Sequence, residues 1–170
     1  MRARMRLVAA SLLLMGMGIG LTACMGGWFT PQLRATLIIA DPVAKGEGFE
    51  VLISVVNMPD SGLSGIQFGT VGNEALTFTN VDITTVVATG ENGFTVTAQN
   101  YVAGPPAKGA LIAVNPPTGV VGGTILKLTF RATTTNPTVS VDKTKVTLLS
   151  HQNTWITTWN LETGKKYYAK

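Results

Sequence analysis

The sequence predicts an all-β domain, and two features of the chain support this. From Leu33 onward, runs of four to nine residues rich in Val, Ile, Thr and Phe alternate with Gly, Pro, Asn and Asp, which is typical of strands joined by turns. No stretch has a convincing helical period. Regularly spaced short strands favour a β-sandwich or barrel over a parallel α/β sheet.

The first 23 residues have the three parts of an export signal. Three arginines lie within the first six residues, residues 7–19 are largely apolar, and Thr22 and Ala23 provide a small-residue cleavage site. The apolar part is interrupted by glycine and is shorter than the roughly 20 apolar residues that cross a bilayer. We therefore expect residues 1–23 to be a signal peptide.

Cys24 is the only cysteine and directly follows Leu21-Thr22-Ala23. This arrangement resembles the lipobox of bacterial lipoproteins, whose cysteine takes a diacylglycerol and becomes the mature N-terminus. The resemblance implies lipid attachment at Cys24 and a protein anchored to a membrane without spanning it. The alternatives are a buried spare thiol, or an ordinary signal peptide that contains a cysteine near its end. Met25 is not a retention-type aspartate, which implies the outer membrane if the cell has two membranes.

Removal of the signal would change the charge of the chain. The full sequence has 13 basic and 9 acidic residues, and loss of three arginines leaves ten basic residues and a net charge of +1. The remaining basic residues form no stripe, so the electrostatic footprint of a nucleic-acid-binding protein is missing. The length suits one domain, which we place at residues 33–170 behind a lipidated tether of residues 24–32.

The expected strands are runs of β-forming residues bounded by turn residues. They are residues 33–40, 49–56, 63–71, 75–78, 83–88, 94–102, 110–114, 124–132, 138–141 and 146–150, with a final pair near 155–160 and 166–169. Alternation is clearest in residues 124–132, where Leu126 and Leu128 share one face while Lys127 and Thr129 share the other. Residues 49–56 alternate in a similar way, so both runs are predicted as central core strands.

Several of these segments, in the same order, resemble the cohesin domains of bacterial surface proteins and cellulosome scaffolds. The matching segments are Gly46 to Val51, Val55 to Pro59, Gly62 to Phe68, Ala75-Leu76, Gly122 to Ala132 and Val146 to Leu149. The resemblance implies a jelly-roll β-sandwich of about nine strands. An immunoglobulin-like sandwich or an unrelated jelly roll would share the strand pattern.

The resemblance also implies a docking face, because cohesins bind dockerin modules on the sheet that contains the strand matching residues 63–71. The candidate partner-binding residues on that strand and its turn are Gln67, Gly69, Val71 and Asn73. The usual Tyr-Asp-Pro turn of the family is replaced by Gly72-Asn73-Glu74, and the outward positions Gln67, Gly69 and Val71 are nearly featureless, whereas cohesins use polar and acidic residues there. Dockerin binding is therefore less well supported than the fold.

Catalytic and metal-binding patterns are missing from the sequence. The only histidine, His151, lies in a polar turn, and the acidic residues are scattered singly, which matches neither a catalytic triad nor a glycosidase pair. No zinc or EF-hand motif is present. We expect no enzyme activity, no catalytic residue, no metal and no cofactor.

Trp155 and Trp159 offer an alternative binding site. On one strand they would share a face about 13 Å apart, and a turn at Thr163-Gly164 would place Trp159 opposite Tyr168. Such a platform could stack sugar rings, whereas the opposing interpretation is that both rings cover the core.

Together these observations predict a membrane-anchored, extracytoplasmic module of the cell envelope that recognises a protein partner. That partner would be dockerin-like or another envelope component. The alternatives are a carbohydrate-binding lipoprotein, with polysaccharide as ligand, and a structural subunit of a secretion or pilus assembly.

Overall fold

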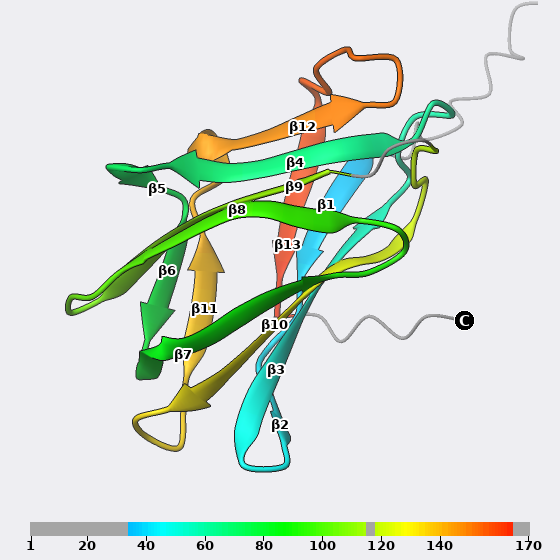
Figure 1. Ribbon diagram of the computed structural model, residues 1–170. Helices are drawn as coiled ribbons and strands as arrows, with labels where there is room; N and C mark the ends of the chain where they lie inside the picture. The colour runs from blue at the N-terminus through cyan, green and yellow to red at the C-terminus, as the bar shows by residue number, and fades with distance from the viewer. Residues whose placement is uncertain (1–33, 115–117, 165–170) are drawn as a thin grey trace, which may run out of the picture. The chain divides into compact units, whose positions relative to one another are not determined.

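The computed structural model describes residues 34–114 and 118–164 (Figure 1). The predicted signal peptide, Cys24, the tether of residues 24–32 and the expected strand 166–169 lie outside the described residues. Within the described part, no helix is long and apolar enough to cross a membrane.

The described residues form two sheets that pack as a sandwich, which confirms the predicted fold class (Figure 1). Sheet A has the order β13 (Trp159–Thr163), β1 (Ala35–Ile39), β3 (Gly48–Val56), β10 (Gly123–Ala132), β7 (Val81–Gly90), with β2 (Val43–Lys45) on β3. Sheet B has the order β11 (Thr138–Val141), β6 (Leu76–Thr79), β9 (Ala107–Val114), β4 (Leu63–Thr70), β12 (Val146–Ser150), with β5 (Asn73–Glu74) on β4 and β8 (Thr95–Val102) on β9. A single 3-10 turn, η1 (Lys143–Lys145), precedes β12 within this part of the chain.

The core lies between the two sheets and follows the predicted alternation. Leu126 and Leu128 of β10 are fully buried, and Leu128 pairs with the equally buried Val51 of β3. Phe68 of β4 enters the same apolar cluster from sheet B. Every second side chain of each strand points inward. The two predicted central strands, β3 and β10, lie in the middle of sheet A.

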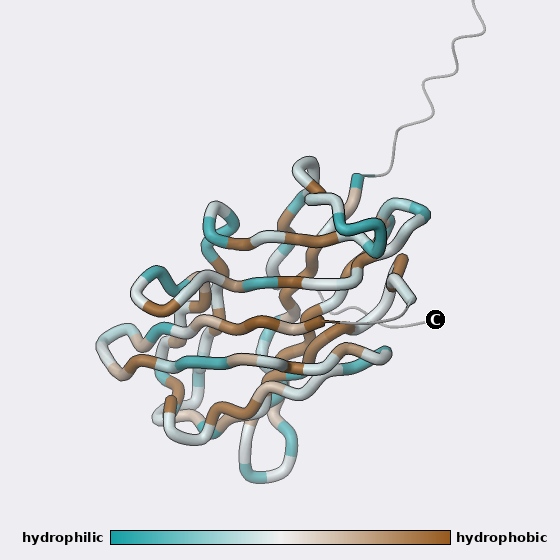
Figure 2. Tube along the Cα trace, turned by 45° about the horizontal axis from the view of Figure 1, so that its top comes forward, coloured by the Kyte–Doolittle hydropathy of each residue, from teal (hydrophilic) through white to brown (hydrophobic). Residues whose placement is uncertain are grey.

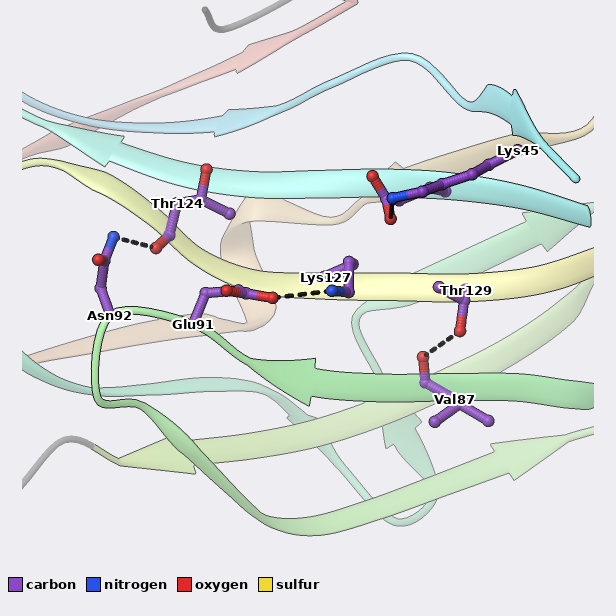
Figure 3. Close-up of polar contacts among 8 residues, drawn as sticks. Lys45, Val87, Glu91, Asn92, Thr124, Lys127 and Thr129 are labelled. Atoms are coloured by element: carbon purple, nitrogen blue, oxygen red, sulfur yellow. Dashed lines mark hydrogen bonds and ion pairs between the residues drawn. The ribbon is translucent and has the colours of Figure 1, made fainter. Parts of the chain in front are cut away.

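The outer face of sheet A carries charged side chains in ion pairs. Lys127 lies 2.9 Å from Glu91, and the side-chain amide of Asn92 donates to the backbone oxygen of Thr124 at 2.7 Å (Figure 3). Arg131 and Glu47 form a further pair at 3.2 Å. Exposed ion pairs of this kind contribute little to stability because water screens them, and their exposure shows that this face is solvated.

Sheet A ends in a parallel pair, β1 with β13, in a sandwich whose other strand pairs are antiparallel among the described residues. The register runs from Ala35 opposite Trp159 to Ile39 opposite Thr163. Parallel neighbours cannot be joined by a tight hairpin. The first and last described strands are neighbours in space although the rest of the sandwich separates them in the sequence.

The expected strand at residues 155–160 is wrong. Residues 151–158 form a turn and loop in which Trp155 makes one isolated bridge to Leu149 of sheet B, and β13 begins only at Trp159, in sheet A. Asn153, with a φ of 57°, lies in the turn before this segment. The expected run is broken because the chain passes from sheet B at Trp155 to sheet A at Trp159. The structure also has the short strands β2 and β5, which are not among the expected strands.

Adjacent residues of β10 provide a test of this register. We expect Leu128→Ala to lower the free energy of unfolding by about 2–5 kcal/mol, because it empties a fully buried site. Thr129→Ala, on the solvated side, should change it by about 0.5 kcal/mol or less. Chemical denaturation of both variants measures the difference, and similar losses for the two would contradict the assigned faces.

Candidate partner-binding face

The outer face of sheet B is organised in rows of directly paired residues. The first row consists of Thr95, Val114, Gly65, Leu149 and Trp155, joined by successive pairings across β8, β9, β4, β12 and the isolated bridge. The second row consists of Ala98, Ile112, Gln67 and Thr147. Directly paired residues point to the same side of a sheet, and their neighbours Ile66, Phe68 and Leu148 point into the core. Both rows therefore face outward.

Two shallow hollows lie on this face. The first, of about 90 Å³, lies over Gly65 and is bordered by Ile112, Val114, Leu149 and Trp155. The second, of about 300 Å³, is bordered by residues that include Gly69, Val71, Ala98, Asn100 and Ala110. Apolar side chains dominate both borders, so the face offers hydrophobic contact area rather than a polar cleft.

Gln67 and Gly69 lie where the sequence predicted, on the outward side of β4. The Gln67 side chain is half-buried, and its amide Nε2 donates to the backbone oxygen of Gly69 at 3.0 Å. Gly69 has a φ of 68°, and a Cβ atom there would overlap the backbone oxygen of Asn73. The glycine is therefore required by the β4–β5 hairpin.

Val71 and Asn73 belong to the hairpin rather than to the strand face. Val71 is 79% exposed and borders the second hollow, whereas Asn73 begins β5 and is exposed. Backbone N–H groups of Glu74 and Gly72 lower the pKa of the Glu74 carboxyl group, and the Gly72 N–H donates at 2.8 Å. Three of the four candidates, Gln67, Gly69 and Val71, thus reach the outer face or its border.

The outer face of sheet B is nearly free of charge. Neither row contains a charged residue, and Lys108, on the outward side of β9, lies four residues from Ile112. Figure 2 shows the strands of this sheet side by side, with hydrophilic residues most frequent in the loops at their ends. The contrast with the ion pairs of sheet A distinguishes the two outer faces.

The expected tryptophan platform is wrong, because the two rings do not share an exposed face. Trp155 is 64% exposed beside the first hollow, but Trp159 is 8% exposed and packs in the core, where Lys143 Nζ lies 4.8 Å from the centre of its ring. The two residues serve different sheets, because Trp155 bridges to β12 and Trp159 pairs with β1. Tyr168, the expected partner of Trp159, lies outside the described residues.

Sequence reasoning missed Gly65, Ile112, Val114 and Leu149 as parts of the face. Gly65 shares the parity of Gln67, and Leu149 that of Thr147, so the period of two could have placed them outward. Apolar residues at outward positions carry no charge or motif that marks them as part of a binding face.

His151 lies in the turn after β12. His151 is exposed, and its backbone N–H donates to the oxygen of Gly62 at 3.0 Å. Within residues 34–114 and 118–164, no three His, Cys, Asp or Glu side chains are grouped closely enough to hold a metal ion.

No protein family model matches the chain, and no curated protein matches it in sequence. Among solved structures, the chain is similar to the sixth cohesin of scaffoldin B from Acetivibrio cellulolyticus, in complex with a dockerin. That match has 15% identity, a TM-score of 0.51, and covers 76% of this chain and 99% of the cohesin. A non-cellulosomal cohesin from Archaeoglobus fulgidus matches at 14% identity, a TM-score of 0.38, and coverages of 76% and 86%.

A third similar structure is the cohesin module of a family 33 glycoside hydrolase from Clostridium perfringens. It has 8% identity, a TM-score of 0.47, and coverages of 76% of this chain and 96% of the module. The structure is thus a two-sheet β-sandwich, and its fold is cohesin-like.

The different exposures of Trp155 and Trp159 predict different accessibility to a quencher. We expect Trp155→Phe to remove most of the acrylamide-dependent quenching contributed by this pair, because its ring is 64% exposed. Trp159→Phe should remove little, since its ring is buried. Stern–Volmer slopes of the two variants provide the measurement, and a larger loss for Trp159→Phe would contradict the placement.

Proposed function

We propose that this protein is a non-enzymatic binding module whose outer face of sheet B docks a protein partner. The observation that carries the proposal is the combination of two uncharged rows and two apolar hollows across β8, β9, β4 and β12. Exposed apolar patches on folded domains commonly mark interaction sites. The outer face of sheet A, with its exposed ion pairs, has the composition of a surface that stays in contact with water.

The cohesin-like fold supports the choice of a protein as partner. The Acetivibrio cohesin that this chain resembles is in complex with a dockerin, so a dockerin-like module is one class of candidate. The uncharged rows favour a partner with a neutral, apolar surface. A charge on the partner would lose its hydration at this face, and no opposite charge there would compensate the loss.

We also propose that the module is held on the cell envelope through lipid on Cys24. The proposal rests on the order of arginines, apolar run, small residues and cysteine in residues 1–24. A lipid anchor would hold the docking face near the membrane without a spanning segment.

A pair of exposed valines allows a test of the docking face in the producing cell. We expect a photo-crosslinking amino acid at Val71, beside sheet B, to give one dominant protein adduct with the full chain. The same amino acid at Val87, on the outer face of sheet A and 51% exposed, should give none. Mass spectrometry identifies the adduct; equal labelling from both positions, or labelling from Val87 alone, would refute the assigned face.

The anchor makes a separate prediction. We expect Cys24→Ser to abolish incorporation of a clickable fatty acid and to shift the protein from the membrane to the soluble or uncleaved pool. The measurement is labelling and fractionation of cells expressing each form, with Thr129→Ala as a control that leaves the N-terminus unchanged. Full fatty-acid labelling of Cys24→Ser would disprove lipidation at this residue.

A further inference from the structure

Gly65 is a glycine that the backbone of β4 does not require. Its φ lies outside the left-handed region, and a Cβ atom there would lie 3.4 Å from Leu149 Cβ and 3.7 Å from Leu149 Cδ2, which is ordinary van der Waals contact. Gly69, two residues further on, differs because its φ is 68°. Glycine inside a strand weakens it and often marks a place where another molecule approaches closely.

The missing side chain produces the first hollow. In its row, Gly65 lies between Val114 and Leu149, whose half-buried side chains form walls on either side. Ile112 closes the hollow from the second row, and the volume is about 90 Å³. An alanine or valine at position 65 would fill part of this space.

The size and chemistry of the hollow limit what can enter it. At about 90 Å³ the open hollow has room for one side chain of modest size, and its largely apolar border favours an aliphatic group. Gln67 also borders the hollow, but its amide N–H already donates to the backbone oxygen of Gly69. With no charged residue in either row, an uncharged occupant is the electrostatically matched one.

Trp155 provides an exposed ring at the edge of the hollow. Its backbone is fixed to sheet B, because Trp155 bridges to Leu149 and the N–H of Ile156 donates to the oxygen of Leu148 at 2.9 Å. A positioned ring that is 64% exposed has much area to lose on binding, and tryptophan is enriched among residues that dominate interface energies.

We propose that the hollow over Gly65 receives one aliphatic side chain of the protein partner, with Trp155 packing beside it. This inference rests on the proposed docking function and adds the contact that holds the partner in place. The partner's contact segment is accordingly neutral, with a single aliphatic residue inserted between Val114 and Leu149.

The test uses the full chain with the photo-crosslinker at Val71, outside the hollow, and measures the yield of partner adduct in the producing cells. We expect Gly65→Ala to lower the yield several-fold and Gly65→Val at least tenfold, because the first occupies part of the hollow and the second occupies more of it. Val114→Thr keeps the shape of one wall but makes it polar, and should lower the yield two- to five-fold. Gly122→Ala is the matched control, since its Cβ would lie 3.5 Å from the oxygen of Val55, away from this face.

Mapping the adduct and truncating the partner's nearest aliphatic residue to alanine completes a double-mutant cycle. We expect that truncation to lower the yield with the wild-type chain and to have little further effect with Gly65→Val. Cellular abundance and protease resistance show whether each variant folds; if Gly65→Val does not accumulate, Gly65→Ala and Val114→Thr decide.

The outcomes separate the inference from the function on which it rests. A partner adduct with the same yield in Gly65→Ala, Val114→Thr and Gly122→Ala would overturn the inference and leave the docking function intact. Absence of any adduct from Val71 would overturn the docking function and, with it, the inference. An adduct with a second copy of the chain, or with lipid or glycan, would overturn the inference by identifying a different occupant.

Discussion

The alternation of side chains across each strand is the constraint on which this structure depends. Two sheets can pack only if the residues between them are apolar, as Val51, Phe68 and Leu128 are. Burying one such side chain contributes about 1.5–3 kcal/mol, so the inward positions decide whether the domain folds. The outward positions do not have to be apolar for the domain to fold, so their composition reflects what each face contacts.

The two outer faces use this freedom differently. On sheet A, Lys127 pairs with Glu91 and Arg131 with Glu47, in the manner of a surface that remains hydrated. On sheet B, the outward residues Ile112, Val114 and Leu149 are apolar although nothing in the fold demands it. A folded domain gains solubility from charge, and the shortage of charge on this face is the reason that the docking proposal places the partner there.

The sequence predicted the sandwich and its two central strands because the period of two is strong in β3 and β10. It failed at Trp159, where the same period was continued through Trp155, because sequence alone does not show that the chain changes sheets between these residues. Gly65 was missed for a different reason. The sequence does not show whether the backbone requires a glycine in a strand; the φ angle and the atoms around the Cα distinguish Gly65 from Gly69.

The residues of the face were thus partly predictable. Gln67 and Gly69 follow from strand parity, and the outward position of Leu149 would have followed in the same way. The position of Trp155 depends on its bridge to Leu149 and on the hydrogen bond from Ile156 to Leu148, which form across a turn at Asn153. Such a contact is set by tertiary packing and has no local sequence pattern.

The parallel pair of β1 and β13 has a mechanical consequence. In a parallel pair, the start of β1 at Ala35 and the end of β13 at Thr163 lie at opposite ends of the ladder. Tension applied between those two points pulls the strands past each other, so the backbone hydrogen bonds of the pair carry the load together. An antiparallel pair pulled from adjacent ends would instead open one bond at a time. The edge of sheet A is therefore built to resist stretching along the chain.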